Sequence, residues 1–370
     1  MRILIAPDKF KGSLGAAEVG QRIAAGVRSS LPDAQIEIAP LADGGEGTAA
    51  AIVEAGNGGW IVCPAHDALG RARETRYGWL PERALAAIDM SAAAGLVQLE
   101  PNERDPLRAS TFGVGEMLQH AAARQARQIV LGLGGSATND GGTGLARALG
   151  FHFLDSNDRE LPNDVPALAL LERIILPNEL HIPPITAACD VRNPLLGPSG
   201  ATRVFGPQKG VTPLQLELLE QALARLAEVA AQTFGSDYRD EAGAGAAGGL
   251  GFGLMTFCGA TIRSGFEVVA EAVDLRRKVE AADIVITGEG KLDRQTLSGK
   301  APAGLAELAR AFRKPVYAIV GQVAADVDAR QLFAEVVPLE DRSENFHETP
   351  ALLETRARDL ALRFLKGESR

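Results

Sequence analysis

Five apolar segments of this sequence each run into a turn that is rich in glycine and charged side chains. The segments lie at residues 3–6, 35–39, 128–133, 185–189 and 283–287. Short apolar runs that alternate with helical patterns, such as the one at 16–30, are typical of a parallel sheet with helical connections. Ligands of such sheets bind at the carboxyl ends of the strands, where these turns lie. The pattern therefore predicts an α/β protein with its binding turns at the strand ends.

Length and composition limit the alternatives. The chain has 370 residues, enough for two domains of ordinary size. Apolar residues make up 46% of it and charged residues 23%, a composition typical of a globular protein with a hydrophobic core. The formal net charge of −9 argues against a nucleic-acid partner, because nucleic-acid binders normally carry a basic face. The three cysteines, Cys63, Cys189 and Cys258, form no C-x-x-C pair, which predicts neither a disulfide framework nor a zinc site and fits a reducing compartment.

The sequence predicts no membrane partner. The apolar run at residues 3–6 is too short for a signal peptide, and no later apolar run approaches the roughly 20 residues of a membrane span. We therefore expect a cytoplasmic protein.

The third turn, at residues 132–142, has the parts of a phosphate cradle. Its closely spaced amides and the hydroxyls of Ser136 and Thr138 suit a phosphate group. It lacks the G-x-x-x-x-G-K-[ST] pattern of a P-loop. It also satisfies the dinucleotide fingerprint G-x-G-x-x-[GA], with Asp155 at about the distance expected for a ribose-binding acid. An NAD-dependent hydroxy-acid dehydrogenase thus stays open beside a phosphate-handling enzyme.

Charged side chains fill the other four turns. Phosphoryl transfer requires donors that hold phosphates, carboxylates that hold Mg²⁺ and a group that orients the attacking hydroxyl. Acids after buried strands could take the last two roles, and lysines beside them could hold a phosphate or a carboxylate. The candidates are Asp8, Lys9, Lys11 and Ser13 in the first turn, Asp43 and Glu46 in the second, Asp190 and Asn193 in the fourth, and Glu289, Lys291, Asp293 and Lys300 in or beyond the fifth.

An ordered set of motifs resembles the type-1 glycerate kinase family. The family pattern A-P-D-S-F-K-G-S stands here at residues 6–13, with Lys9 in place of the Ser that the family often has. The further motifs are ADGGEGT at 42–48, GGSATNDGG at 134–142, CDVRNP at 189–194, FGPQKG at 205–210, AGAAGG at 244–249 and ITGEGKLD at 286–293. They span nearly the whole chain, so together they are more specific than any single turn.

The resemblance implies a function and a fold. It implies phosphorylation of D-glycerate by ATP with Mg²⁺, at the 2-hydroxyl, giving 2-phosphoglycerate and ADP. It also implies two α/β domains, a Rossmann-like or flavodoxin-like parallel-sheet domain formed by residues 1–65 and 284–370, and a second α/β domain inserted at 66–283. The active site of such a kinase would lie in the cleft between them, and we expect a monomer or a homodimer.

For such a kinase, the charge of the side chains and their positions at strand ends suggest roles for individual residues. The catalytic candidates are Asp190, Lys11 and Asp8, with Asp190 the first choice to accept or orient the substrate hydroxyl proton. The candidates for ATP phosphates are Gly134, Gly135, Ser136, Thr138, Asn139, Asp140 and Gly141. Lys291, Lys300, Asn193 and Ser13 are candidates for glycerate or the migrating phosphoryl group, and Asp43, Glu46 and Asp293 for Mg²⁺. A glycerate 3-kinase giving 3-phosphoglycerate and a sugar-acid-binding regulator remain as further alternatives.

Overall fold

The computed structural model describes residues 1–10, 12–293, 301–324, 329–339 and 348–365. The chain divides into two compact units, each with its own sheet. Unit 1 comprises residues 1–43, 50–57 and 265–370, and unit 2 comprises residues 44–49 and 58–264. The predicted class, α/β with parallel sheets, is confirmed by the sheets of both units.

Unit 1 is built on a parallel sheet. The strand order is β13-β12-β11-β1-β2, and every neighbouring pair runs parallel. Counted within the unit, this order is 2-1-3-4-5, the flavodoxin-like arrangement, in which the strand order reverses between β1 and β11. The strands are β1 (Arg2–Ile5), β2 (Gln35–Ile38), β11 (Ile284–Leu292), β12 (Val316–Val323) and β13 (Glu335–Pro338).

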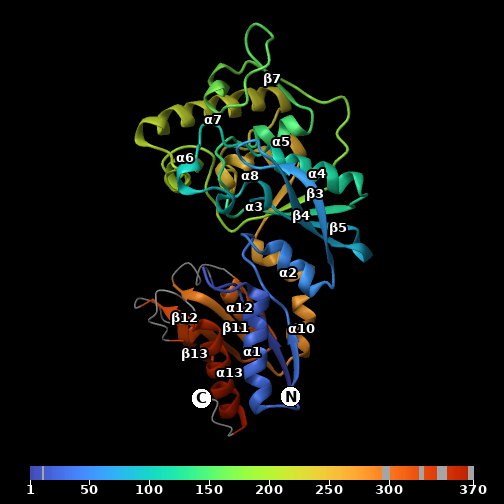
Figure 1. Cartoon of the computed structure of the whole chain (residues 1–370), viewed down its shortest axis with the longest axis vertical. Helices are drawn as coiled ribbons and strands as arrows, with labels where there is room; N and C mark the ends of the chain where they lie inside the picture. Colours follow the sequence, from blue (N-terminus) through green and yellow to red (C-terminus); the bar gives the residue numbers. More distant parts are fainter. Residues whose placement is uncertain (11, 294–300, 325–328, 340–347, 366–370) are drawn as a thin grey trace. The chain divides into compact units, whose positions relative to one another are not determined.

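Helices cover both faces of this sheet (Figure 1). Side chains of a strand alternate between faces, so Ile3 and Ile5 pack with α1 and α13, while Leu4 packs with the helices opposite. Both faces are buried, which explains the nearly continuous apolar strands. The helices of unit 1 are α1 (Ala16–Ser30), α2 (Thr48–Ala55), α9 (Gly265–Ala272), α10 (Leu275–Ala281), α12 (Ala301–Ala311) and α13 (Thr349–Leu365), with the first residues of α2 belonging to unit 2.

Unit 2 has a mixed sheet. Its order is β10-β9-β6-β5-β4-β3, parallel from β10 to β5 and antiparallel from β5 to β3. A separate two-stranded antiparallel sheet pairs β7 with β8. The strands are β3 (Gly59–His66), β4 (Ala72–Leu80), β5 (Leu85–Asp89), β6 (Gln128–Gly132), β7 (His152–Leu154), β8 (Arg173–Ile175), β9 (Ile185–Ala188) and β10 (Thr261–Arg263).

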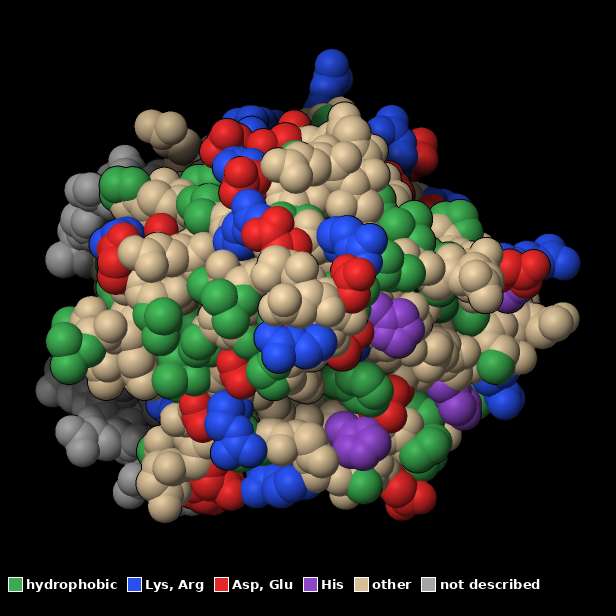
Figure 2. Space-filling model, turned by 90° about the horizontal axis from the view of Figure 1, so that it is seen from above, with side chains coloured by type: hydrophobic (Ala, Val, Ile, Leu, Met, Phe, Trp, Pro, Cys, Tyr) green, Lys and Arg blue, Asp and Glu red, His purple; other side chains and the backbone are tan. Residues whose placement is uncertain are grey.

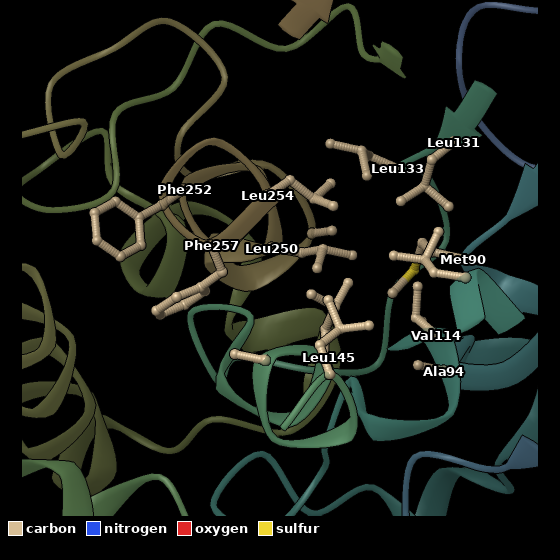
Figure 3. Packing of buried hydrophobic residues seen from close by; sticks show 14 of the residues in the cluster. Met90, Ala94, Val114, Leu131, Leu133, Leu145, Leu250, Phe252, Leu254 and Phe257 are labelled. Atoms are coloured by element: carbon tan, nitrogen blue, oxygen red, sulfur yellow. The ribbon is translucent and has the colours of Figure 1, made fainter. Parts of the chain in front are cut away.

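One apolar core joins the sheet of unit 2 to its helices. Leu131 of β6, Leu145 of α5, and Leu250 and Leu254 of α8 point toward one another in this core (Figure 3). Its close packing fixes the strand ends to which the candidate turns are attached. The helices are α3 (Ser91–Ala94), α4 (Phe112–Ala123), α5 (Thr143–Ala148), α6 (Ala201–Phe205), α7 (Pro213–Phe234) and α8 (Ala246–Cys258), with a 3₁₀ turn at Pro207–Lys209.

The unit boundaries differ from the predicted domain boundaries at 65/66 and 283/284. All of β3 pairs with β4, so unit 2 begins at Gly58. Helices α9 and α10 pack with α12, and α10 also contacts β1, so unit 1 resumes at Gly265. Residues 44–49 belong to unit 2, because the carbonyl of Gly44 accepts hydrogen bonds from the amides after β6.

The fifth predicted turn is a strand. The sequence predicts that the strand at 283–287 ends before Gly288, whereas β11 continues to Leu292. The register with β12 runs through Glu289 opposite Val320 and Leu292 opposite Val323. Pairing with β12 therefore overrides the turn tendency of the two glycines.

No helix within the described ranges is long and apolar enough to span a membrane. On the face of the molecule drawn in Figure 2, basic and acidic side chains are interspersed. That pattern differs from the single-sign surface expected of a nucleic-acid binder.

Candidate functional site

Three of the predicted turns meet in unit 2. A Cβ atom on Gly44 would lie 2.6 Å from the carbonyl oxygen of Ala188 at the end of β9, and one on Gly134 would lie 2.4 Å from the Cα of Gly45. The carbonyl of Gly44 accepts hydrogen bonds from the amides of Leu133 and Gly134, at 3.0 and 3.3 Å. Only glycines permit backbones to approach this closely. The glycines of the second and third turns are thus required for packing these turns against β9.

The main chain of the third turn offers unused donors. Within the described residues, several of its amides donate to no protein acceptor, although most of the residues that carry them are buried. Buried amides without a partner are rare, and each costs roughly 1–3 kcal/mol. A partner from outside the chain is therefore favoured. The amides belong to Gly135, Ser136, Thr138, Asn139 and Asp140.

The carboxylate of Asp140 holds this turn in shape. It accepts hydrogen bonds from the amide and hydroxyl of Thr111, both at 2.8 Å, and from the amides of Gly142 and Gly144, both at 3.1 Å. Burial raises the pKa of this carboxyl, and the four donated hydrogen bonds act in the opposite direction. The side chain is committed to the protein, so a ligand role of Asp140 rests on its amide.

The motifs at 205–210 and 244–249 support the same turn from inside. The buried Nζ of Lys209 donates a hydrogen bond of 2.6 Å to the carbonyl of Thr138. A Cβ on Gly248 would lie 1.9 Å from that same oxygen. Gly248 lies in a run of three residues with positive φ, which turns the start of α8 beneath the turn. Three motifs that are far apart in the sequence thus form one buried assembly.

Asn139 adds a second anchor. Its Nδ2 donates to Thr202 Oγ1 at 3.0 Å, and both residues are fully buried. Its Oδ1 is buried and has no hydrogen-bond partner within the described residues. Whichever way the amide is turned, one of its two polar atoms lacks a protein partner. The side chain of Asn139 therefore keeps one polar atom that can form a further hydrogen bond beside the turn.

The fourth turn follows β9. Asp190 is half-buried, and its Oδ1 accepts a hydrogen bond of 3.0 Å from Ser264 Oγ, which lies just after β10. Asn193 Nδ2 donates to the carbonyl of Ser199 at 2.7 Å, and its own carbonyl accepts from the amide of Gly245. Asp190 and the third turn thus both follow the carboxyl ends of neighbouring parallel strands, β9 and β6. The side-chain amide of Asn193 instead closes its own loop.

Sequence reasoning missed Asp89 and Lys209. Asp89, the last residue of β5, accepts the amides of Gly47 and Ala49, both at 3.0 Å, and so holds the start of α2. Its signal was an acid at the end of an apolar strand, the same feature that identified Asp190. Lys209 is the one lysine that the sequence contains between Lys11 and Lys278, a signal that composition could have given.

A second group of candidates lies in unit 1, beside the switch point between β1 and β11. The amide of Asp8 donates to the carbonyl of Gly288 at 2.8 Å, and its Oδ1 accepts from the amide of Lys9 at 2.7 Å. Asp8 and Glu289 are both buried, which is unusual for acids. Ligands of flavodoxin-like sheets bind at this position.

The remaining candidates are dispersed. Ser13 lies in the turn before α1, where its amide donates to the carbonyl of Phe10. Lys291 is exposed on β11, Asp293 follows that strand, and Asp43 is half-buried beyond β2. Glu46 is an exposed residue of unit 2. Lys11 and Lys300 lie outside the described residues. Within the described part of the chain, no three His, Cys, Asp or Glu side chains gather as a metal site.

The structure disfavours the dinucleotide alternative. In a dinucleotide-binding unit, the strand after the glycine turn lies in the same sheet as the strand before it. Here β7 pairs with β8 in a separate sheet. Asp155 is bound by Arg159 and by amides of its own loop, and the hydrogen bond from the Arg159 side chain is the main cause that lowers its pKa to about 2.

Comparisons with known proteins agree with the motifs. The glycerate kinase family model matches residues 3–365. A glycerate kinase of Bacillus subtilis is 42% identical, over 98% of this chain and 97% of that protein. A glycerate 2-kinase of Escherichia coli is 42% identical, over 88% and 87%. A solved structure from Salmonella typhimurium LT2, assigned as a glycerate kinase 2, has a TM-score of 0.89 and 40% identity and covers the whole of both chains.

Proposed function

The chain belongs to the glycerate kinase family, and from that premise we propose that it transfers the γ-phosphoryl group of ATP to the 2-hydroxyl of D-glycerate, giving 2-phosphoglycerate and ADP. The observation that carries the proposal is the row of unpaired amides in the third turn. Consecutive N–H groups form a concave donor surface for phosphate oxygens. The choice of the 2-hydroxyl is supported by the relative named as a glycerate 2-kinase.

In unit 2, the third turn would hold the phosphates and Asp190 would handle the proton. The amides of Gly135 and Ser136 stand at the accessible end of the turn, because Gly135 is exposed. Asp190 would accept the proton of the attacking hydroxyl, while Ser264 fixes the rotation of its carboxylate. The hydroxyl oxygen then forms the new P–O bond as ADP leaves.

In unit 1, Asp8 and Lys291 are assigned to the substrates. Their positions at the ends of β1 and β11 are those at which parallel sheets bind ligands. Lys11 and Lys300 are assigned with Lys291 to the glycerate carboxylate and the migrating phosphoryl group. Mg²⁺ typically uses one or two carboxylates together with nucleotide phosphates, and would neutralise phosphate charge. Asp43, Glu46 and Asp293 are its proposed carboxylate ligands. We further propose a cytoplasmic monomer or homodimer.

The proposal is tested by product analysis. The protein is incubated with ATP, Mg²⁺ and D-glycerate, and ³¹P NMR resolves 2-phosphoglycerate from 3-phosphoglycerate. We expect the 2-phosphate and one ADP per product molecule. Formation of the 3-phosphate would overturn the assigned hydroxyl, and the absence of either product would overturn the kinase itself. Reduction of NAD by added glycerate would instead support a dehydrogenase.

The role of Asp190 is tested in the same assay. Asp190→Asn removes the proton acceptor and keeps the shape, so kcat should fall by roughly 10²–10⁴-fold. Asp155→Asn is the matched control, because Asp155 closes a loop after β7 and is assigned no role in the reaction. Wild-type turnover by a folded Asp190→Asn variant would remove Asp190 from the mechanism.

A further inference from the structure

Lys209 is an unusual residue of unit 2. Its side chain is 1% exposed, and its Nζ donates to the carbonyl of Thr138. Within the described residues, Lys209 forms no ion pair. An ammonium that is removed from water without a contacting carboxylate is strongly disfavoured. The site therefore needs a compensating charge or a neutral amine.

The charged groups around Lys209 do not supply that charge directly. Asp140, on the turn that Lys209 contacts, is bound on all sides by Thr111, Gly142 and Gly144. Arg104 reaches the carbonyl of Gln208 and adds positive charge. Arg203 on α6 is paired with Glu217 and Glu220 of α7. The remaining neighbour, α8, contains no Asp, Glu, Lys, Arg or His.

We propose that Lys209 is a positioning residue of the phosphate-binding turn whose ammonium is the internal counter-charge of the bound nucleotide, and that it takes up one proton from solvent as the nucleotide binds. This rests on the proposed function. The hydrogen bond to the Thr138 carbonyl couples Lys209 to the segment whose amides are unpaired. An anion bound by those amides lies next to a low-dielectric interior, through which its charge acts on Lys209 with little screening.

The protonation balance of Lys209 supports this coupling. Burial lowers the pKa of Lys209 to about 7, and the charge of Asp140 opposes that shift. Near pH 8 the amine is therefore mostly neutral before the nucleotide binds. A nearby polyanion raises the pKa of an amine, so binding converts the amine to the ammonium. Both forms carry an N–H that can donate to Thr138, so the turn keeps its shape in either state.

Isothermal titration calorimetry tests the proposal. The full-length protein is titrated with ATP and Mg²⁺ at pH 8, without glycerate, in two buffers of different ionisation enthalpy. The difference in heat gives the protons taken up. We expect about 0.9 proton per ATP for the wild type, because an amine with a pKa of about 7 is about 90% neutral at pH 8. Lys209→Gln keeps a donor for Thr138 but cannot titrate, so proton uptake should disappear and the Kd for ATP should rise about tenfold. Lys209→Met also removes the donor and should weaken ATP binding further.

Lys278→Met is the control, because Lys278 pairs with Glu37 in unit 1 and lies outside the proposed site. It should retain the uptake of the wild type. Unchanged uptake in Lys209→Gln, or no uptake by a wild type that binds ATP, would overturn the role of Lys209 and leave the kinase standing. No binding of ATP and no phosphoglycerate would overturn both proposals. If Lys209→Met is misfolded, Lys209→Gln alone decides, since its amide can keep the hydrogen bond.

Discussion

The turn at residues 134–142 and the segment at residues 288–293 contain similar kinds of residue and have different structures. Both combine glycines with polar and charged residues after an apolar strand. In unit 2 the first becomes a tight turn whose glycines meet the backbones of Gly45 and Gly253. In unit 1 the second continues β11, where a Cβ on Gly288 would lie 2.7 Å from the carbonyl oxygen of Ile319 on β12. Glycine thus allows close backbone packing in both units, around a turn in unit 2 and between the neighbouring strands β11 and β12 in unit 1.

The difference shows where each region keeps its chemistry. The turn of unit 2 offers main-chain N–H groups, and its charged side chains, Asp140 and the underlying Lys209, are buried as supports. The segment of unit 1 carries charged side chains on a regular strand, including buried Glu289 and exposed Lys291. Substitution of a buried support in unit 2 should therefore lower the stability of that unit. Substitution of a charged side chain on β11 should remove the chemistry of that side chain alone.

The largest effect is expected from Gly248→Ala. A Cβ there would lie 1.9 Å from the carbonyl oxygen of Thr138, and φ is +69°. Backbone must move, so we expect a loss of about 4 kcal/mol or more in the free energy of unfolding of unit 2. Both tryptophans of the sequence, Trp60 and Trp79, lie in unit 2, so urea unfolding followed by tryptophan fluorescence measures it.

Gly259→Ala is the matched control for Gly248→Ala. Gly259 caps the other end of α8 with φ +61°, and a Cβ there meets nothing within 4 Å. Only the cost of positive φ remains, about 1 kcal/mol. Equal losses in the two variants would show that contact with Thr138 is not what requires glycine at position 248.

Asp140→Asn should have the next largest effect. The NH2 group of the new amide would replace one carboxylate oxygen, and would face either the three donors that now point at Oδ2 or the one that points at Oδ1. We therefore expect unit 2 to lose about 3 kcal/mol. Asp155→Asn changes a partly exposed carboxylate that binds its own loop, and should leave the tryptophan-monitored transition nearly unchanged. A stable Asp140→Asn variant with weakened ATP binding would instead indicate direct contact between this carboxylate and the ligand.

Much of this fold is predictable from local sequence. The helix at 16–30 and the long helix ending at Phe234 follow from apolar periodicity, since each buries one face. The continuation of β11 does not, because hydrogen bonds to β12 outweigh the local preference of Gly288 and Gly290 for a turn. Strand ends are decided by neighbours that lie far away in the sequence.

The candidate site follows the same division. The turn at 134–142 can be proposed from its glycines and hydroxyls, and Asp190 from its place after an apolar strand. The carboxylate of Asp140 looks equally available in the sequence, and only the fold reveals its four donors. The burial of Lys209 depends on tertiary packing, in which α6 contacts both α8 and the 3₁₀ turn that carries Lys209. Local pattern thus locates the turn, while tertiary packing separates its supports from its binding groups.

The pH dependence of stability should reveal Lys209 as a support of unit 2. Its pKa is about 7 in the folded protein and has its ordinary value of about 10.5 in the unfolded chain. Between these values the unfolded chain binds more protons, so stability rises with pH, by about 2 kcal/mol from pH 7 to 9. Unfolding of unit 2 is measured across this range for the wild type and Lys209→Met, and the difference isolates Lys209.

The comparison with Lys209→Met is needed because two thiols of unit 2 change the stability in the opposite direction as the pH rises. Burial raises the pKa of Cys63 to about 11 and that of Cys258 to about 12. Above about pH 9 the unfolded thiols lose protons that the folded ones keep, so stability falls. The wild type and Lys209→Met share this loss of stability. Parallel curves for wild type and Lys209→Met would show that Lys209 keeps its proton in the folded protein throughout this range.

The smallest effect is expected from Thr287→Val in unit 1. Thr287 is fully buried within β11, and its Oγ1 donates a hydrogen bond of 2.8 Å to the carbonyl of Ala6. This bond joins β11 to the residue that follows β1, two residues before Asp8. Valine keeps the shape and removes one hydrogen bond, a loss of about 1 kcal/mol. Hydrogen exchange of β1 and β11 peptides should accelerate about fivefold, and Thr287→Ser should retain wild-type protection. The tryptophan-monitored transition should not move, because the cores of the two units are separate clusters. A matching shift of that transition would mean that the two units unfold together. The structural difference between the turn of unit 2 and the β11 segment of unit 1 would then no longer predict separate responses to substitution.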